Sequence, residues 1–166
     1  MNGYLPLYLR DVKGWLPAGA DGTLALFTGI STLGAIPISL LSDKIGRRKV
    51  FNIIINFIAI IGVGMLSVAD GMMIWIIILL VGIGRDGLIA LSNASVMDCK
   101  GVGPIYTGTA IGLFQMFARL GNAISPPIGN SMASIWTGLP FIVWALFGLF
   151  ALICFYLSEE TGHNKR

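Results

Sequence analysis

Three ionisable side chains lie inside long apolar stretches of this sequence. Arg85 and Asp86 are neighbours in the stretch 72–97, and Arg119 is the single charged residue between positions 101 and 158. If both stretches are helices that cross a bilayer in opposite directions, a rise of about 1.5 Å per residue brings the three groups to a similar depth. A charge at the bilayer centre costs about 2.5–3.5 kcal/mol or more. We therefore expect each group to be paired or in contact with water.

Two roles for these charges are open. In the first, Asp86 neutralises Arg119 or Arg85, and the group only holds helices together. In the second, two arginines and one aspartate leave a local excess of positive charge that faces a cavity. That excess would suit an anionic solute, and Asp86 would be a candidate for proton coupling.

Small and polar residues form one face of the stretch 105–133. Positions 108, 112, 115, 119, 122, 126 and 129 lie three or four residues apart and share a helical face, whereas the opposite face is bulky and apolar. A polar face in a membrane helix must contact protein or water. On the stretch 72–97, Asn93 shares a face with Asp86. The candidates for solute binding or ion coupling are Arg85, Asp86, Asn93, Gln115, Arg119 and Asn122.

The composition requires a membrane around these residues. Of the 166 residues, 55% are hydrophobic and 11% are charged, against about 25% charged in ordinary soluble domains. A soluble domain is excluded, because this chain cannot cover a water-facing surface with polar groups. Continuous apolar runs such as residues 76–80 exclude an outer-membrane barrel, whose strands alternate in polarity. Nucleic acid is excluded as a partner, because the basic residues flank apolar spans.

The expected fold is an all-α bundle of membrane helices. A short apolar piece, residues 5–9, precedes five full spans at about 23–42, 50–69, 72–97, 105–133 and 140–157, and residues 158–166 form a polar tail. Pro37, Pro126 and Pro127 are expected to kink or break their helices, because proline removes a backbone donor. The third and fourth spans carry the charges and are expected to be inner helices. The second and fifth lack ionisable side chains and are expected outside.

The basic residues predict the orientation of the chain. Seven of them fall on one side of the membrane if every span crosses: Lys44, Arg47, Arg48, Lys49, Lys100, Lys165 and Arg166. The other side has only Arg10 and Lys13. Because basic loops stay inside, the loop 43–49 and the C-terminus are expected in the cytoplasm and the chain in the plasma membrane.

The loop between the first two spans carries the most specific local pattern. It reads Ser39-Leu40-Leu41-Ser42-Asp43-Lys44-Ile45-Gly46-Arg47-Arg48, in which Gly46 permits a tight turn. This order resembles the loop motif of the major facilitator superfamily, where a glycine often stands in place of Ser39. The resemblance implies that Ser39, Asp43, Lys44, Gly46, Arg47 and Arg48 form a latch between two halves of a transporter and bias its inward- and outward-facing states.

The resemblance covers nearly the whole chain. Gly108-Thr109-Ala110 with Gly112, and Pro126-Pro127-Ile128-Gly129, are similar to the eleventh helix of that family, and Glu160-Thr161-Gly162 is similar to the ending of the twelfth. The five spans would then be helices eight to twelve, and residues 5–9 the end of helix seven. Residues 1–166 would form one partial domain, about the C-terminal half of a twelve-helix secondary transporter.

The function implied is transport of a small polar solute, with an anion favoured, by alternating access. The implied partners are the bilayer, the solute, a coupling proton or ion, and the missing N-terminal half. No cofactor or metal is expected. An enzyme is not expected, because the sequence has no ATP-binding loop and no nucleophile with a matching base. The alternative is a truncated or split product that does not transport alone and acts as a membrane-embedded fragment or partner subunit.

Overall fold

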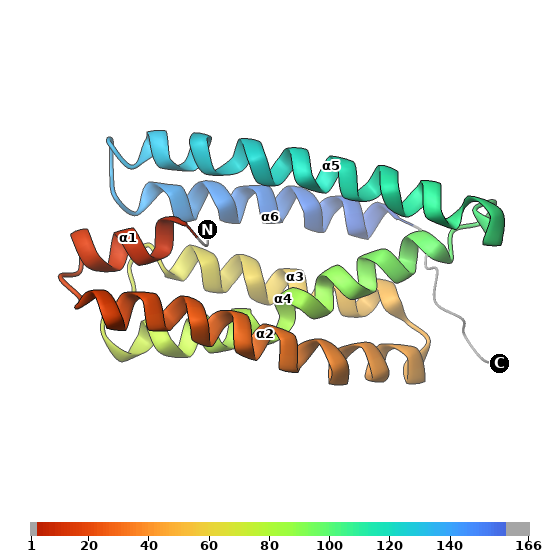
Figure 1. Ribbon diagram of the computed structural model, residues 1–166, viewed down its shortest axis with the longest axis horizontal. Helices are drawn as coiled ribbons and strands as arrows, with labels where there is room; N and C mark the ends of the chain where they lie inside the picture. Colours follow the sequence, from red (N-terminus) through yellow and green to blue (C-terminus); the bar gives the residue numbers. More distant parts are fainter. Residues whose placement is uncertain (1–2, 159–166) are drawn as a thin grey trace.

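A computed structural model describes residues 3–158, and these residues form six α-helices and no strand. The helices are α1 (Tyr4–Asp11), α2 (Pro17–Ile45), α3 (Arg48–Met65), α4 (Met72–Met97), α5 (Gly103–Met132) and α6 (Leu139–Leu157). The five long helices form an elongated bundle, with the connections at its two ends (Figure 1). The predicted all-α fold is confirmed. The predicted tail after Ser158, including Glu160-Thr161-Gly162, Lys165 and Arg166, lies outside the described residues.

Four helices are long and apolar enough to cross a membrane, namely α2, α3, α4 and α6. Helix α5 has 30 residues and is long enough, but it falls short of the same apolarity. The reason is its polar face, since glycine, serine, asparagine, glutamine and arginine replace large apolar side chains along its whole length. The chain is therefore a multi-pass membrane protein with a fifth, more polar long helix.

Four of the five expected spans differ from the helices at one or both ends, and the largest differences are in α2 and α3. Helix α2 begins at Pro17, six residues before the expected start, because proline fits the first turn of a helix, where its missing N–H costs nothing. Helix α3 ends at Met65, and residues 66–69 turn toward α4. Helix α4 has the expected bounds. The short apolar piece lies within α1.

The helices are not broken at the prolines, and a kink at Pro37, Pro126 or Pro127 stays a prediction. Helix α2 continues through Pro37, and α5 continues through Pro126 and Pro127. Each proline removes one backbone hydrogen bond, but the turns on either side keep theirs. Apolar surroundings favour this outcome, because a broken helix would leave several more backbone groups without partners.

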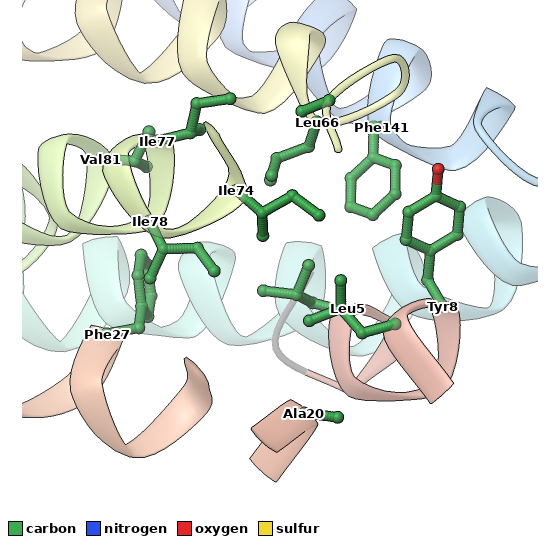
Figure 2. Close-up of a cluster of buried hydrophobic side chains, with 12 residues drawn as sticks. Leu5, Tyr8, Ala20, Phe27, Leu66, Ile74, Ile77, Ile78, Val81 and Phe141 are labelled. Atoms are coloured by element: carbon green, nitrogen blue, oxygen red, sulfur yellow. The ribbon is translucent and has the colours of Figure 1, made fainter. Parts of the chain in front are cut away.

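The short helix α1 closes one end of the bundle. Its buried side chains Leu5, Tyr8 and Leu9 join residues of α2, α4 and α6 in the main apolar cluster (Figure 2). The Tyr4 hydroxyl donates to the Thr137 carbonyl over 2.8 Å. Just after α1, Lys13 forms an ion pair with Asp70 in the turn before α4. The hydrogen bond that Lys13 donates to Asp70 within this pair raises the pKa of Lys13. This end of the bundle is thus held by both apolar and charged contacts.

The helices differ in how deeply they are packed. Helix α4 contacts α2, α3 and α5 and has the largest buried share of the candidate spans, as expected of an inner helix. Helix α3 packs between α4 and α6. Gly129 is the single buried residue of α5 among the described residues, and the expected inner position of α5 in the complete transporter stays a prediction. Helix α5 lies at the edge of the bundle, where α4 and α6 cover one flank of it.

Candidate functional site

Helices α2 and α4 approach each other closely at the centre of the bundle. A Cβ added at Gly34 would lie 2.3 Å from the backbone oxygen of Ile83, so the two backbones touch there. Next to this contact, Ser31 Oγ accepts a hydrogen bond from the Asp86 N–H over 3.2 Å, and the Thr32 hydroxyl reaches Asp86 Oδ2 over 3.5 Å. Two hydroxyl side chains of α2, Ser31 and Thr32, therefore contact the charged residue Asp86 of α4.

Arg85 and Asp86 form an ion pair within α4. Arg85 Nη1 lies 3.3 Å from Asp86 Oδ1, and the two side chains are 38% and 29% exposed. The Arg85 guanidinium lies over the Phe27 ring, 5.5 Å from its centre. Of the two partners considered for Asp86, the structure shows Arg85.

Arg119 does not join this pair. It is exposed on α5 and makes no ion pair or hydrogen bond with any residue in the range 3–158. Asp86 and Arg85 are therefore paired as expected, whereas Arg119 has no partner within the described residues, and its expected contact with water stays a prediction. The reason for the missing partner is the peripheral position of α5, which leaves this part of its polar face without a protein neighbour in the described chain.

Three other residues of the polar face of α5 lie near neighbouring helices, whereas Gly108 and Gly112 have nothing within 4 Å of an added Cβ. Gln115 Nε2 donates to Asn93 Oδ1 over 3.0 Å and joins α5 to α4. Gly129 lies against the Trp144 ring of α6, where an added Cβ would approach a ring atom to 2.6 Å. Asn122 lines a cavity that Arg85 also lines. The structure thus brings together Asn93 with Gln115, and Arg85 with Asn122.

This cavity has a volume of about 400 Å³ and lies among α3, α4, α5 and α6, with Phe27 of α2 at one wall. Four polar residues line it: Asn56, Arg85, Asn122 and Ser125. The remaining lining is apolar and comes mainly from α3 and α6. The Asn56 amide donates to the Gly148 carbonyl over 3.3 Å, and the Trp144 ring N–H donates to the Ser125 carbonyl over 3.5 Å.

The loop motif forms a compact charged network at the other end of the bundle from α1. Gly46 has the left-handed conformation (φ 71°), as the motif predicts, and its N–H donates to the Ser42 carbonyl over 2.8 Å. Arg48 binds Asp43 over 3.1 Å, the Ala94 carbonyl over 3.0 Å, and Asp98. Arg48 therefore connects the start of α3 to the C-terminal ends of α2 and α4.

The other motif residues have fewer contacts, and one participant was missed. Lys44 and Arg47 are exposed and make no ion pair with a described residue, and Ser39 is half-buried. Asp98, which shares Arg48 with Asp43, was not among the predicted site residues. A signal for it exists in the sequence, since an acid at the end of the third span falls on the same membrane side as the loop 43–49.

The basic loops gather at one end of the bundle, as the orientation rule requires. The α2–α3 loop, the α4–α5 loop and the end of α6 lie together there, while α1 lies at the opposite end (Figure 1). Lys49 Nζ donates to the Ser158 carbonyl over 2.6 Å, which joins the first of these segments to the last. Which end faces the cytoplasm stays a prediction.

Comparison with known proteins gives one family and one relative. The family described as Major Facilitator Superfamily matches residues 1–166. An uncharacterized protein of Archaeoglobus fulgidus is 30% identical over 142 residues, which is 86% of this chain and 64% of that protein. The chain thus spans less than two thirds of the length of this curated relative. No solved structure matches the chain.

Proposed function

This chain belongs to the Major Facilitator Superfamily, and from this membership we propose that it takes part in moving a small polar solute across a membrane by alternating access. The family is one of transporters, so the prediction that the chain is not an enzyme is confirmed. The relative of uncharacterized function supports no particular solute.

An anion is the solute class that the charges support best. The observation that carries this proposal is Arg119, a charged residue on a long helix that has no counter-ion within the described residues. A cation in a membrane-embedded position is expected to face protein or water, because contact with lipid is costly. Asp86 is already occupied by Arg85, so Arg119 supplies the uncompensated charge. Gln115 and Asn122, one turn away on the same face, would contribute neutral hydrogen bonds to the solute.

We also propose that this chain is about the C-terminal half of the transporting unit. The order of one short helix followed by five long ones, with the motif between α2 and α3, supports helices eight to twelve. In this arrangement the exposed face of α5 would face the N-terminal half. The latch would lie in the cytoplasm of a plasma-membrane protein, and a proton or ion would supply the driving force. Its residues would be Ser39, Asp43, Lys44, Gly46, Arg47 and Arg48.

The anion proposal can be tested by thermal stabilisation of the purified chain in detergent. Acetate, lactate, citrate, phosphate and sulfate are compared with glucose and choline at matched ionic strength. We expect at least one anion to raise the unfolding temperature of the wild-type chain, and less so that of Arg119→Gln. Stabilisation by none of the anions, or equal stabilisation of Arg119→Gln, would contradict the proposal.

The alternative is a truncated or split product that does not transport alone. The DNA sequence upstream of Met1 distinguishes a fragment of a full transporter from a separate short product. An open frame with six or seven further apolar spans supports a fragment of a full transporter, whereas a promoter and ribosome site directly before Met1 supports a separate short product. Solute uptake by proteoliposomes that contain this chain alone would contradict the alternative that the chain does not transport by itself.

A further inference from the structure

The cavity between α3, α4, α5 and α6 has the two chemical surfaces of a site for an amphipathic acid. We propose that it binds a compact apolar monocarboxylate, with the carboxylate held by Arg85 and Asn122 and the apolar body held by α3 and α6. All the lining residues come from this chain. The proposal therefore does not depend on transport or on a second half.

The polar wall offers hydrogen-bond donors that the protein itself does not use. A guanidinium has five N–H donors. Arg85 donates one hydrogen bond, from Nη1 to Asp86, among the described residues. The Asn122 side chain makes no hydrogen bond with a residue in the range 3–158. These two donor groups come from α4 and α5 and line one cavity. A carboxylate has two acceptor oxygens and suits the planar fork of an arginine.

The charges beside the polar wall of the cavity favour a ligand with one carboxylate. Arg85 is the one charged residue that lines the cavity, and Asp86, its ion-pair partner, is not part of the lining. Because Asp86 already balances most of the arginine charge, one carboxylate would be held mainly by hydrogen bonds. A second carboxylate would have no positive partner here, so we expect dicarboxylates to be rejected.

The opposite wall is mainly apolar, and two of its N–H donors already have acceptors in the protein. The Asn56 amide donates to Gly148, and the Trp144 ring N–H donates to Ser125. What remains is aliphatic and aromatic surface, for example from Ile60 and Phe147. Such a surface would favour an apolar ligand body by removing it from water.

The volume limits the ligand to a small acid. The cavity has a volume of about 400 Å³. This volume lies near the lower end of the usual range for ligand pockets, roughly 300–1,000 Å³. A carboxylic acid with one aromatic ring, or a short branched aliphatic acid, fits this space. A long-chain lipid does not.

The test is equilibrium dialysis of the 166-residue chain in lipid nanodiscs against radiolabelled 4-nitrobenzoate. The neutral analogue 4-nitrobenzyl alcohol is measured in parallel, and empty nanodiscs are subtracted. We expect saturable binding of the acid, about tenfold or more weaker in Arg85→Gln. Arg85→Lys is expected to lie between the two, because it keeps the charge but loses the fork. Arg10→Gln, which removes an exposed arginine from α1, is the control for net charge and should bind like the wild type.

Two further variants keep the test decisive if Arg85→Gln misfolds through its unpaired Asp86. Arg85→Gln combined with Asp86→Asn leaves no unpaired charge, and Asn122→Leu does not touch the ion pair. Both variants are expected to weaken binding.

Fluorescence gives a second measurement of where the acid binds, because nitroaromatic acids quench tryptophan fluorescence on contact. In a chain carrying Trp15→Phe, Trp75→Phe and Trp136→Phe, bound 4-nitrobenzoate should quench the remaining Trp144, which lines the cavity.

Three results would overturn the proposal. These are equal binding of the alcohol and the acid, undiminished binding in the folded Arg85 and Asn122 variants, and saturable binding without quenching of Trp144. Binding that depends on Arg119 but not on Arg85 would place the ligand on the exposed face of α5, which contradicts this cavity and leaves the proposed anion transport intact. Conversely, a failed Arg119 test would leave the cavity untouched.

Discussion

Neighbouring arginines in the basic loop have different environments. Arg48 is 18% exposed and joins Asp43, Asp98 and a backbone carbonyl, whereas Arg47 is exposed and makes no ion pair with a described residue. The difference arises because α3 begins at Arg48, so that its side chain meets the end of α4. Arg47 therefore adds to the basic charge of the loop, whereas Arg48 also holds the ends of α2, α3 and α4 together.

We predict that Arg48→Gln lowers the free energy of unfolding by about 1–3 kcal/mol, because it leaves the mostly buried Asp98 carboxylate without its charged donor. Denaturant unfolding in mild detergent, followed by near-ultraviolet circular dichroism, measures this change. Arg47→Gln is the matched control, with the same loss of charge one residue away and an expected change within about 0.5 kcal/mol. Equal effects of the two substitutions would show that the network around Arg48 contributes no stability.

The partners of charged residues were the least predictable part of the site. Spacing along the sequence gives the helix face on which Asp86 lies, but it does not say which side chain of α2 reaches it; Ser31 and Thr32 do. The same limit applies to Asp98, whose partner depends on how two helix ends meet. For Arg119, polarity alone suggested an inner position, although burial depends on the neighbours that surround the helix.

At the level of helices, small residues set how closely α2, α3 and α4 can approach. Beside the contact of Gly34 with Ile83, an added Cβ at Gly84 would lie 2.5 Å from Ile55, and one at Gly87 would lie 2.9 Å from Ile38. Glycines at such crossings let membrane helices pack through many short contacts, which matters because water does not drive helices together there. Helix α4 is therefore the packing centre of the bundle, as well as the carrier of the ion pair.

We predict that Gly34→Ala destabilises the bundle by about 1–3 kcal/mol or more, because the new methyl group meets backbone atoms that cannot rotate away. Thermal unfolding in detergent, monitored by size-exclusion chromatography, gives the comparison. Gly29→Ala on the same helix is the control; nothing lies within 4 Å of its added Cβ, and stability should stay equal or rise slightly. A stable Gly34→Ala chain would mean that α2 and α4 separate at little cost.

Helix existence was more predictable than helix ends and continuity. Long apolar runs predicted all five long helices, since a chain without water must satisfy its backbone groups within each helix. The ends of α2 and α3 depended on local capping, such as Pro17 at the first turn. Of the two outcomes expected at Pro37, Pro126 and Pro127, a break does not occur, because a break in apolar surroundings would leave several backbone groups without partners.

For the whole molecule, the two ends of the bundle are chemically different. One end holds the α2–α3 and α4–α5 loops with Lys44, Arg47, Arg48, Lys49 and Lys100 (Figure 1). The other holds α1, the ion pair of Lys13 with Asp70, and an aromatic group that includes Tyr8, Phe141 and Trp144. Charge asymmetry of this kind sets topology because basic loops resist translocation.

We therefore predict that the end with the basic loops faces the cytoplasm, and two cysteines can report it. Cys99 is exposed in the α4–α5 loop at that end, and Thr137→Cys adds an exposed thiol in the α5–α6 turn at the other. Each is tested alone, with Cys154→Ser removing the cysteine of α6 and Cys99→Ser added for the second. A membrane-impermeant maleimide should label Cys99 only in inverted vesicles and Thr137→Cys only in right-side-out vesicles. The reversed pattern would place the Arg48 network outside the cell, and labelling of both from both sides would mean that the five basic residues do not fix a single topology.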